Sequence, residues 1–463
     1  MKKIFSIFIS LTILFNTYSC AFAENLLPST ANNKFGIHIT SEKDLQSAAN
    51  LINSDGGDWG YVTIVINESE RDHNRWQDVL DQMRSLHLIP IVRIATKADG
   101  DSWEIPQEPE INNWIAFLNN LNWVVKNRYV IIGNEPNHAS EWGGKIDPAG
   151  YSNYLYEFAQ KLHQASPDFF VLPAGLDASA ANTKNTMDEA RFLRGMLAAQ
   201  PKLFDQLDGW TSHSYPNPDF SGKDTDTGRG TIDTFDWELN YLKSLGVTKN
   251  LPVFITETGW SNINIDPEKI GSMYEYAFRN VWNDSRVIAV TPFILDYPQP
   301  PFSQFSWEKS DGSFYPYYSA FQKIPKVAGD PTQIESGQIV AAFAQPVIPL
   351  GSDFVGFILA KNTGQSIWDT KNIKIANDLG ENFIKDYPFN DLEPGKLGLM
   401  FFKAETPYST GIYSRSLFLR GSKGQRITNS FLIEAAVVKL DQTKISEFFR
   451  SFLGSLNLSN FIK

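Results

Sequence analysis

The sequence predicts an α/β protein in which a (β/α)8 TIM barrel is followed by a smaller all-β sandwich domain and a C-terminal amphipathic helix. Three observations carry this prediction. Between Lys34 and Lys326, apolar strand-like runs alternate eight times with amphipathic, helix-like stretches. After 327–332, helical periodicity gives way to short strand-like runs. Near the C-terminus, apolar residues recur at helical spacing over 444–456.

The strand-like runs of the first region are continuously apolar and partly β-branched, as in a parallel sheet that is covered on both faces. They lie at 35–39, 61–66, 89–94, 129–133, 170–174, 207–213, 251–255 and 287–293. Helices are expected at 43–53, 75–86, 110–126, 148–165, 187–199, 235–245, 267–283 and 316–323. The alternative is an open doubly wound sheet, which usually has a glycine-rich loop after its first strand. ThrSerGluLysAsp (40–44) is not such a loop.

The second region has short strand candidates that are broken by Gly, Pro and Asn, which is typical of an antiparallel β-sandwich. The candidates are 338–343, 353–360, 371–375, 396–403, 411–420 and 430–438. We therefore expect a signal peptide at 1–23, the barrel at 30–326, the sandwich at 333–440 and the amphipathic helix at 443–460.

The C-terminal helix is expected to present one apolar face, which consists of Ile445, Phe448, Phe449, Phe452, Leu453 and Leu456. Such a face either docks onto its own protein or attaches the chain to a partner or an envelope surface.

The N-terminus has the three regions of a cleavable secretory signal: LysLys, an apolar run from Ile4 to Phe15, and AlaPheAla at 21–23. Cleavage after Ala23 predicts a secreted or periplasmic protein of bacterial type. The single cysteine, Cys20, lies inside this segment, and the bulky Tyr18 before it makes a lipid anchor the weaker alternative. The mature chain then has no cysteine, which excludes disulfides, thiolate zinc sites and a cysteine nucleophile.

Charge and composition exclude several classes of partner. The formal net charge of −11 repels phosphate backbones, so we expect no nucleic-acid partner. Beyond the N-terminal segment, no stretch is long and apolar enough to span a bilayer. The sequence has no HisGluxxHis motif, no phosphate-binding loop and no clustered ligand set, so neither a metal nor another cofactor is expected.

Two glutamates stand at the ends of predicted barrel strands. Glu135 lies in GlyAsnGluPro (133–136) after the fourth strand, and Glu257 lies in ThrGluThrGlyTrp (256–260) after the seventh. The carboxyl ends of all barrel strands meet at one mouth, so residues distant in sequence can face each other there. A retaining glycosidase needs two carboxyl groups about 5–5.5 Å apart. The pair therefore predicts carbohydrate chemistry.

Together with SerHisSerTyrPro (212–216), these motifs resemble those of glycoside hydrolase clan A, in particular families 5, 39 and 17, over about 35–326. The resemblance implies that Glu135 is the acid/base and Glu257 the nucleophile. It also implies three substrate-binding residues, namely Asn134, which contacts the sugar 2-hydroxyl, and His213 and Tyr215, which support the subsite.

Five further residues are candidates for the substrate site. Arg93 ends the third strand and either bridges to Glu257 or closes a salt bridge within the barrel, and His38 ends the first strand as a pocket-lining residue. Three tryptophans could either stack on sugar faces or pack in the core. These are Trp142, Trp260 and Trp307, of which Trp307 resembles the clan's tryptophan after strand eight.

The second domain also has a resemblance. Its segments 362–368, 391–395 and 410–413 resemble the immunoglobulin-like domain that is named for its four tryptophans, although only Trp368 of the four is present. This resemblance implies a fold but does not identify a partner.

The leading interpretation of the whole chain is a secreted retaining glycosidase that cleaves β-glycosidic bonds of an oligo- or polysaccharide. The alternatives are a transglycosidase, a non-catalytic carbohydrate-binding protein, and an adhesion or scaffold protein.

Overall fold

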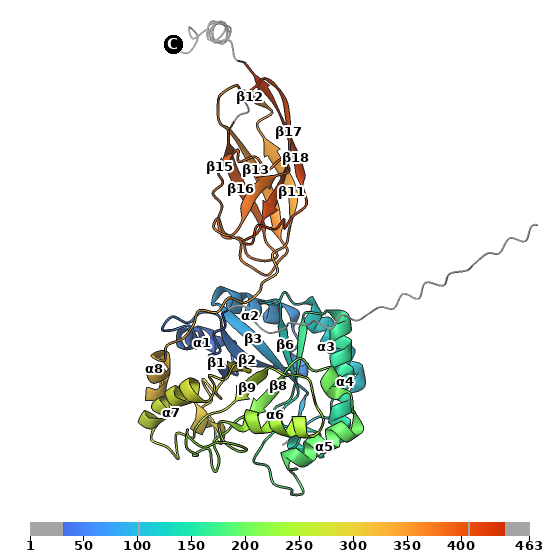
Figure 1. The fold of residues 1–463 in the computed structure, drawn as a ribbon, viewed down its shortest axis with the longest axis vertical. Coiled ribbons are helices and arrows are strands. Elements are labelled where there is room, and N and C mark those ends of the chain that lie inside the picture. Colours follow the sequence, from blue (N-terminus) through green and yellow to red (C-terminus); the bar gives the residue numbers. More distant parts are fainter. Residues whose placement is uncertain (1–30, 101, 406–407, 440–463) are drawn as a thin grey trace, which may run out of the picture.

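The computed structural model describes residues 31–100, 102–405 and 408–439. They form a barrel and an elongated sandwich that stands at one end of it (Figure 1). The predicted signal peptide and the predicted C-terminal helix lie outside the described residues.

The first domain is the predicted barrel, built from eight parallel strands. They are β1 (Gly36–Ile39), β2 (Gly60–Asn67), β3 (Leu88–Ala95), β6 (Arg128–Ile132), β7 (Phe169–Pro173), β8 (Trp210–His213), β9 (Val253–Glu257) and β10 (Val287–Val290). Five strands pair in the order β1-β2-β3-β6-β7, and three in the order β10-β9-β8. Parallel bridges from Phe35 to Val290 and from Asp177 to His213 join the two groups, so the sheet closes on itself.

Helices surround the barrel, one after each strand (Figure 1). They are α1 (Leu45–Ile52), α2 (His73–Ser85), α3 (Glu108–Asn120), α4 (Pro148–Ala165), α5 (Glu189–Ala199), α6 (Thr234–Ser244), α7 (Pro267–Asn280) and α8 (Pro316–Gln322). Several begin on sequence signals, since Asp72 and Asp147 cap the first backbone N–H groups of α2 and α4 and Pro is the first residue of α4, α7 and α8. None of the helices in the described residues is long and apolar enough to cross a bilayer.

The barrel strands are buried, and their carboxyl ends open onto a shared cavity. Every residue of β9 is buried, as its continuous apolar run predicts, and Glu257 is the last residue of that strand. A small hairpin of β4 (Ala98–Asp99) and β5 (Ser102–Trp103), which the sequence pattern did not predict, extends the loop after β3.

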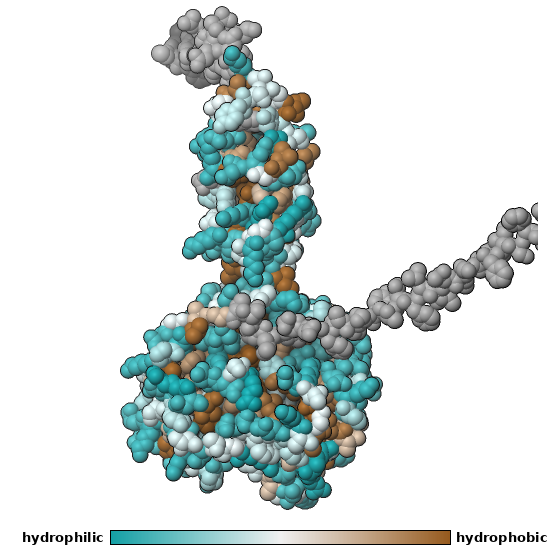
Figure 2. Space-filling model, viewed as in Figure 1, coloured by the Kyte–Doolittle hydropathy of each residue, from teal (hydrophilic) through white to brown (hydrophobic). Residues whose placement is uncertain are grey.

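The second domain consists of two four-stranded sheets. One has the order β11 (Gly337–Ala344), β13 (Phe354–Asn362), β16 (Leu397–Ala404) and β15 (Ile384–Asp386). The other has the order β12 (Val347–Pro349), β18 (Phe431–Val438), β17 (Gly411–Arg420) and β14 (Lys374–Asn377). All pairings are antiparallel except that of β12 with β18. Trp368 is fully buried between the sheets, and hydrophobic side chains also reach the sandwich surface (Figure 2).

Two differences from the predicted sandwich strands have local causes. The three-residue strands β12 and β15 are too short to give a periodic signal. The strand that was expected at 371–375 begins at Lys374, because the Asp369 side chain accepts hydrogen bonds from the backbone N–H groups of Lys371 and Asn372 and so forms a turn there.

The sandwich contacts the barrel at the end opposite the mouth. The backbone N–H of Lys126 donates to the Thr332 carbonyl at 2.8 Å, and Gln365 Nε2 donates to the Val125 carbonyl at 2.9 Å. Both barrel residues come just before β6 begins, whereas Glu135 follows the other end of that strand. The sandwich therefore supplies no wall of the cavity at the mouth.

We expect a chain that ends at Gly329 to fold on its own, because the barrel has a separate hydrophobic core. Losing the few hydrogen bonds to the sandwich, each worth about 1 kcal/mol, should lower the midpoint of thermal unfolding by a few degrees only. Circular dichroism of the fragment and of the full chain measures this. A fragment without a cooperative transition would show that the barrel depends on the sandwich.

Candidate active site

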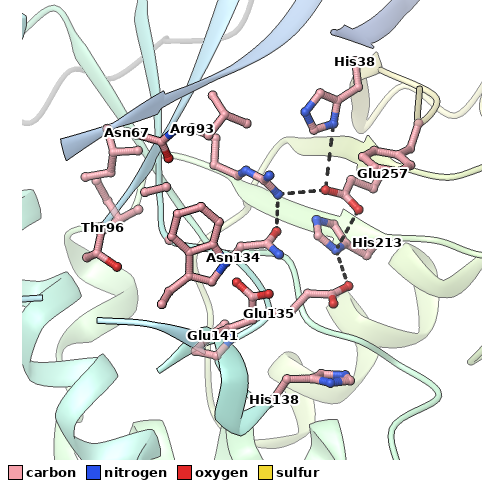
Figure 3. Close-up of a pocket in the computed structure, with 18 of the residues that line it drawn as sticks. His38, Asn67, Arg93, Thr96, Asn134, Glu135, His138, Glu141, His213 and Glu257 are labelled. Atoms are coloured by element: carbon pink, nitrogen blue, oxygen red, sulfur yellow. Dashed lines mark hydrogen bonds and ion pairs between the residues drawn. The ribbon is translucent and has the colours of Figure 1, made fainter. Parts of the chain in front are cut away.

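A cavity of about 670 Å³ opens at the carboxyl ends of the barrel strands. Eight of the ten predicted site residues line it, from five strand ends and the loops that follow them (Figure 3). They are His38, Arg93, Asn134, Glu135, Trp142, His213, Tyr215 and Glu257.

Glu135 and Glu257 face each other across His213 (Figure 3). His213 Nδ1 lies 2.7 Å from Glu135 Oε1 and 3.8 Å from Glu257 Oε2. The three atoms that these side chains could offer to a ligand lie within 4.8 Å of one another, so the two carboxyl groups approach to about the spacing of a retaining pair. A cation there would compete with the hydrogen bonds that already hold both glutamates.

The backbone turns sharply to bring Glu135 into the cavity. Gly133 has φ +89° and Glu135 has φ +29°, a conformation that non-glycine residues rarely adopt. The Glu135 backbone N–H donates to the Gly175 carbonyl at 3.1 Å, which fixes the turn. Strain of this kind is found at functional sites, where the surrounding structure maintains it.

Glu257 is held as a carboxylate by its neighbours. Arg93 Nη1 donates to Oε1 at 2.8 Å, and the Tyr215 hydroxyl donates to Oε2 at 3.1 Å. Burial raises the pKa of Glu257, but the charges of His213 and Arg93 outweigh burial and leave the pKa below its usual value. The side chain is therefore charged at neutral pH, as a nucleophile must be.

Arg93 also orients Asn134. Its Nη1 donates to Asn134 Oδ1 as well as to Glu257, so it makes the bridge across the cavity that was one of its two predicted roles. With its oxygen engaged in this way, Asn134 presents its NH₂ group to acceptors in the cavity, one of which is the Glu141 carboxyl group.

We expect Arg93→Met to shift the pH dependence of activity. Without the guanidinium, the pKa of Glu257 rises, because one of the charges that lower it is gone. The rate falls where Glu257 becomes protonated, so the acidic limb of the kcat/KM profile should move to higher pH. An unmoved acidic limb, in a variant that unfolds at the wild-type temperature, would contradict the role given to Arg93.

His213 occupies a space that only glycine leaves open. A Cβ added at Gly175 would lie 2.2 Å from His213 Cδ2, and His213 is 3% exposed. Burial lowers the pKa of His213, while the charge of Glu257 and the hydrogen bond with Glu135 raise it more, so the net shift is upward. His213 thus links both carboxyl groups from one fixed position.

Because of this contact, Gly175→Ala is expected to lower kcat/KM by about 10²-fold, the scale of a misplacement near 1 Å in a catalytic group. The added methyl group must displace the His213 ring and, with it, the hydrogen bond to Glu135. Steady-state kinetics measure the loss. Gly195→Ala is the control for steric strain alone, because its added methyl group would crowd Pro148, which does not line the cavity. Equal losses in both variants would contradict the prediction.

His38 lines the cavity in neutral form. Burial, followed by the charge of Arg93, lowers its pKa to about 3. Its Nδ1 lies 3.9 Å from Glu257 Oε1, and neither ring nitrogen has a hydrogen-bond partner among the described residues. A neutral imidazole there can contact a substrate hydroxyl, but it does not add positive charge to the site.

The structure corrects two of the tryptophan predictions. Trp260 donates its indole N–H to the Gly222 carbonyl, and Trp307 packs against Tyr274 and Phe321 in the core. Neither side chain lines the cavity, because the loops that carry them turn these rings inward. Phe293, three residues after the end of β10, lines the cavity instead. Trp142 does line the cavity, although it is largely buried.

Sequence reasoning missed three carboxyl groups of the cavity lining, Glu70, Glu141 and Asp177, of which Glu141 lies beside the predicted pair. Glu141 ends a short 3₁₀ helix, Ala139–Glu141, in the loop after Glu135, and Figure 3 shows it beside Asn134 and Glu135. Burial and the charge of Glu135 raise the pKa of Glu141 to about 7. The available signal was its position six residues after Glu135, in a loop of the mouth.

Comparisons with known proteins give likenesses of structure only. No family model matches the chain, and no curated protein is similar to it in sequence. A family 39 glycoside hydrolase from the gut symbiont Bacteroides cellulosilyticus WH2 is 15% identical, with a TM-score of 0.46 over 81% of each chain. A β-mannanase from Thermomonospora fusca, in complex with mannohexaose, is 14% identical, with a TM-score of 0.41 over 64% of this chain and 89% of that chain.

A third similar structure is a GH5_18 variant from Streptomyces cattleya in complex with Manβ1-4GlcNAc. It is 12% identical, with a TM-score of 0.45 over 69% of this chain and 86% of that chain. At identities this low and TM-scores below 0.5, no conclusion about activity or substrate rests on these likenesses.

Proposed function

We propose that this protein is a retaining glycosidase that cleaves β-glycosidic bonds by double displacement, with Glu257 as nucleophile and Glu135 as acid/base. The observation that carries the proposal is the pair of facing carboxyl groups with unequal surroundings, one of them fixed as a carboxylate by Arg93 and Tyr215. Two glutamates can take different roles when their surroundings shift their pKa values apart.

In the first step, a Glu257 carboxylate oxygen attacks the anomeric carbon while the bond to the leaving oxygen breaks and Glu135 gives that oxygen its proton. In the second step, Glu135 removes a proton from water, the water oxygen attacks the same carbon, and the bond to Glu257 breaks. Asn134 can donate its NH₂ group to the sugar 2-hydroxyl as positive charge develops on the ring.

The carbohydrate class of the substrate is supported by the cavity. Its volume of about 670 Å³ lies in the usual range of small-molecule sites, and aromatic side chains line it together with the polar ones. Tyr154, Phe293 and Phe302 are among these aromatic lining residues, a residue class that can stack on sugars.

A panel of aryl β-glycosides tests the activity with the wild type and Glu257→Gln. We expect release of the aryl group by the wild type alone, with the β-anomer as the first sugar product in proton NMR. Initial release of the α-anomer would overturn retention. Oligosaccharide binding without turnover would favour the carbohydrate-binding alternative, and transfer to an added sugar in preference to water would favour a transglycosidase.

We also propose that the chain is exported through the segment 1–23, with cleavage after Ala23, on the sequence pattern alone. Expression in a bacterium should give a periplasmic or secreted product that begins at Glu24, as measured by intact mass. Palmitate labelling that depends on Cys20 would support the lipid-anchor alternative.

A further inference from the structure

One outward sheet face of the sandwich is apolar. Phe343 of β11 pairs with Phe357 of β13, which pairs with Phe401 of β16, so three phenylalanines form a row across neighbouring strands. Their ring centroids are 5.6 and 6.4 Å apart. Phe343 is 48% exposed and Phe401 56% exposed. Large exposed aromatics in direct contact mark an interaction surface.

Aliphatic residues extend this row along the strands. Leu359 pairs with Leu399, and Val355 and Leu397 continue the face at either end, where each pairs with an exposed lysine, Lys403 and Lys361 respectively. We call these seven residues the apolar face: Phe343, Val355, Phe357, Leu359, Leu397, Leu399 and Phe401. Such aliphatic groups have no polar edge for sugar hydroxyls, so the face suits an apolar partner better than a carbohydrate.

The outward face of the opposite sheet differs. There Ser414 of β17 pairs with Glu434 of β18, and Ser416 pairs with Leu432, so polar and apolar residues mix as on an ordinary solvated sheet. That face also exposes Ile412 and Leu432, but it has no row of adjacent aromatic rings like the one on the apolar face.

The chain leaves the sandwich from the opposite sheet, at the end where β13 begins. The Leu350 backbone N–H donates to the Val438 carbonyl at 2.9 Å, which ties the end of β18 to the turn that precedes β13. β13 begins at Phe354, next to Val355 of the apolar face. Five residues, 439–443, can span up to about 17 Å, which exceeds the spacing of about 10 Å between two packed sheets.

We propose that the C-terminal segment 444–456 folds back as an amphipathic helix and covers the apolar face. As a helix, its 13 residues would be about 20 Å long and about 10 Å wide. The three strands of the face are about 10 Å across, and the six steps from Val355 to Lys361 run for about 20 Å. Size and polarity therefore match.

The tether favours this occupant over a second copy or a lipid surface. A segment joined by a short linker is present at an effective concentration in the millimolar range, which a separate molecule rarely reaches. The six apolar residues of the segment, three of them Phe, would otherwise stay in water next to an equally apolar sheet.

Disulfide trapping in the full chain tests the proposal, with Cys20→Ser to remove the only native cysteine. Leu399→Cys with Phe449→Cys should form an intramolecular disulfide, seen as a faster band at monomer mass on a non-reducing gel. Leu399→Cys with Glu447→Cys is the matched control, because Glu447 lies on the polar side of the predicted helix and should cross-link at least tenfold more slowly.

Three outcomes of this experiment would overturn the proposal: equal cross-linking of both pairs, disulfide-linked dimers in place of the intramolecular product, or cross-linking that is abolished by anionic phospholipid vesicles which bind the full chain.

A dye measurement is independent of engineered cysteines. A chain that ends at Lys439 should enhance the fluorescence of anilinonaphthalene sulfonate several-fold over the full chain, and Phe401→Lys should remove that gain. An unchanged signal on deletion would also overturn the proposal.

Discussion

Glu257→Ala is expected to lower kcat/KM for aryl β-glycosides by about 10⁴-fold or more, the scale seen when an enzyme loses its catalytic nucleophile. The reason is that Arg93 and Tyr215 fix this carboxylate where it faces Glu135, and no other described carboxylate in the cavity shares those contacts. Stopped assays at high enzyme concentration measure the residual rate. Added azide can occupy the vacated space and should give the α-glycosyl azide.

Tyr215→Phe is the matched control for this prediction. This variant loses the hydrogen bond that the Tyr215 hydroxyl donates to Glu257 Oε2 at 3.1 Å, but it keeps the Glu257 carboxylate. A loss of about 10- to 100-fold is expected, because the hydroxyl donates to a charged group. Azide should give no glycosyl azide with this variant. A Glu257→Ala enzyme that is no slower than Tyr215→Phe would show that the nucleophile lies elsewhere.

The site residues at strand ends could be predicted from the sequence. An apolar run shows where its strand ends, and the residue at that end must lie at the mouth of the barrel. His38, Arg93 and Glu257 each lie at or near the carboxyl end of a run whose apolar pattern is plain. Once eight such runs predict a closed barrel, their ends must meet at one mouth.

Residues within three positions of a strand end, such as Glu135 and Tyr215, could still be placed in this way, but residues farther along a loop could not. Trp307 lies 17 residues after β10 ends, and its direction depends on the path of that loop, which brings Tyr274 and Phe321 around the ring. Glu141 was missed for the same reason, since no periodicity predicts a 3₁₀ turn that points into the cavity. Short strands such as β12 have too few residues to show alternation at all.

Glu135→Ala is expected to have an effect that depends on the leaving group. For aryl glycosides with poor leaving groups, kcat/KM should fall by about 10³-fold, within the usual contribution of a general acid. For a dinitrophenyl glycoside, which needs little proton donation, the first step should proceed at nearly the wild-type rate. Water then attacks slowly because no base remains, so the glycosyl-enzyme should accumulate as a burst and as an increase in intact mass.

Added azide needs no base, so it should release that intermediate from Glu135→Ala as the β-glycosyl azide, the opposite anomer to the one expected from Glu257→Ala. Glu141→Ala is the matched control, because it removes a carboxyl group from the same loop, six residues away, and should not respond to azide. The anomers are distinguished by proton NMR. If Glu141→Ala gave the β-azide and Glu135→Ala did not, the proton donor would be Glu141, whose pKa of about 7 suits an acid at neutral pH.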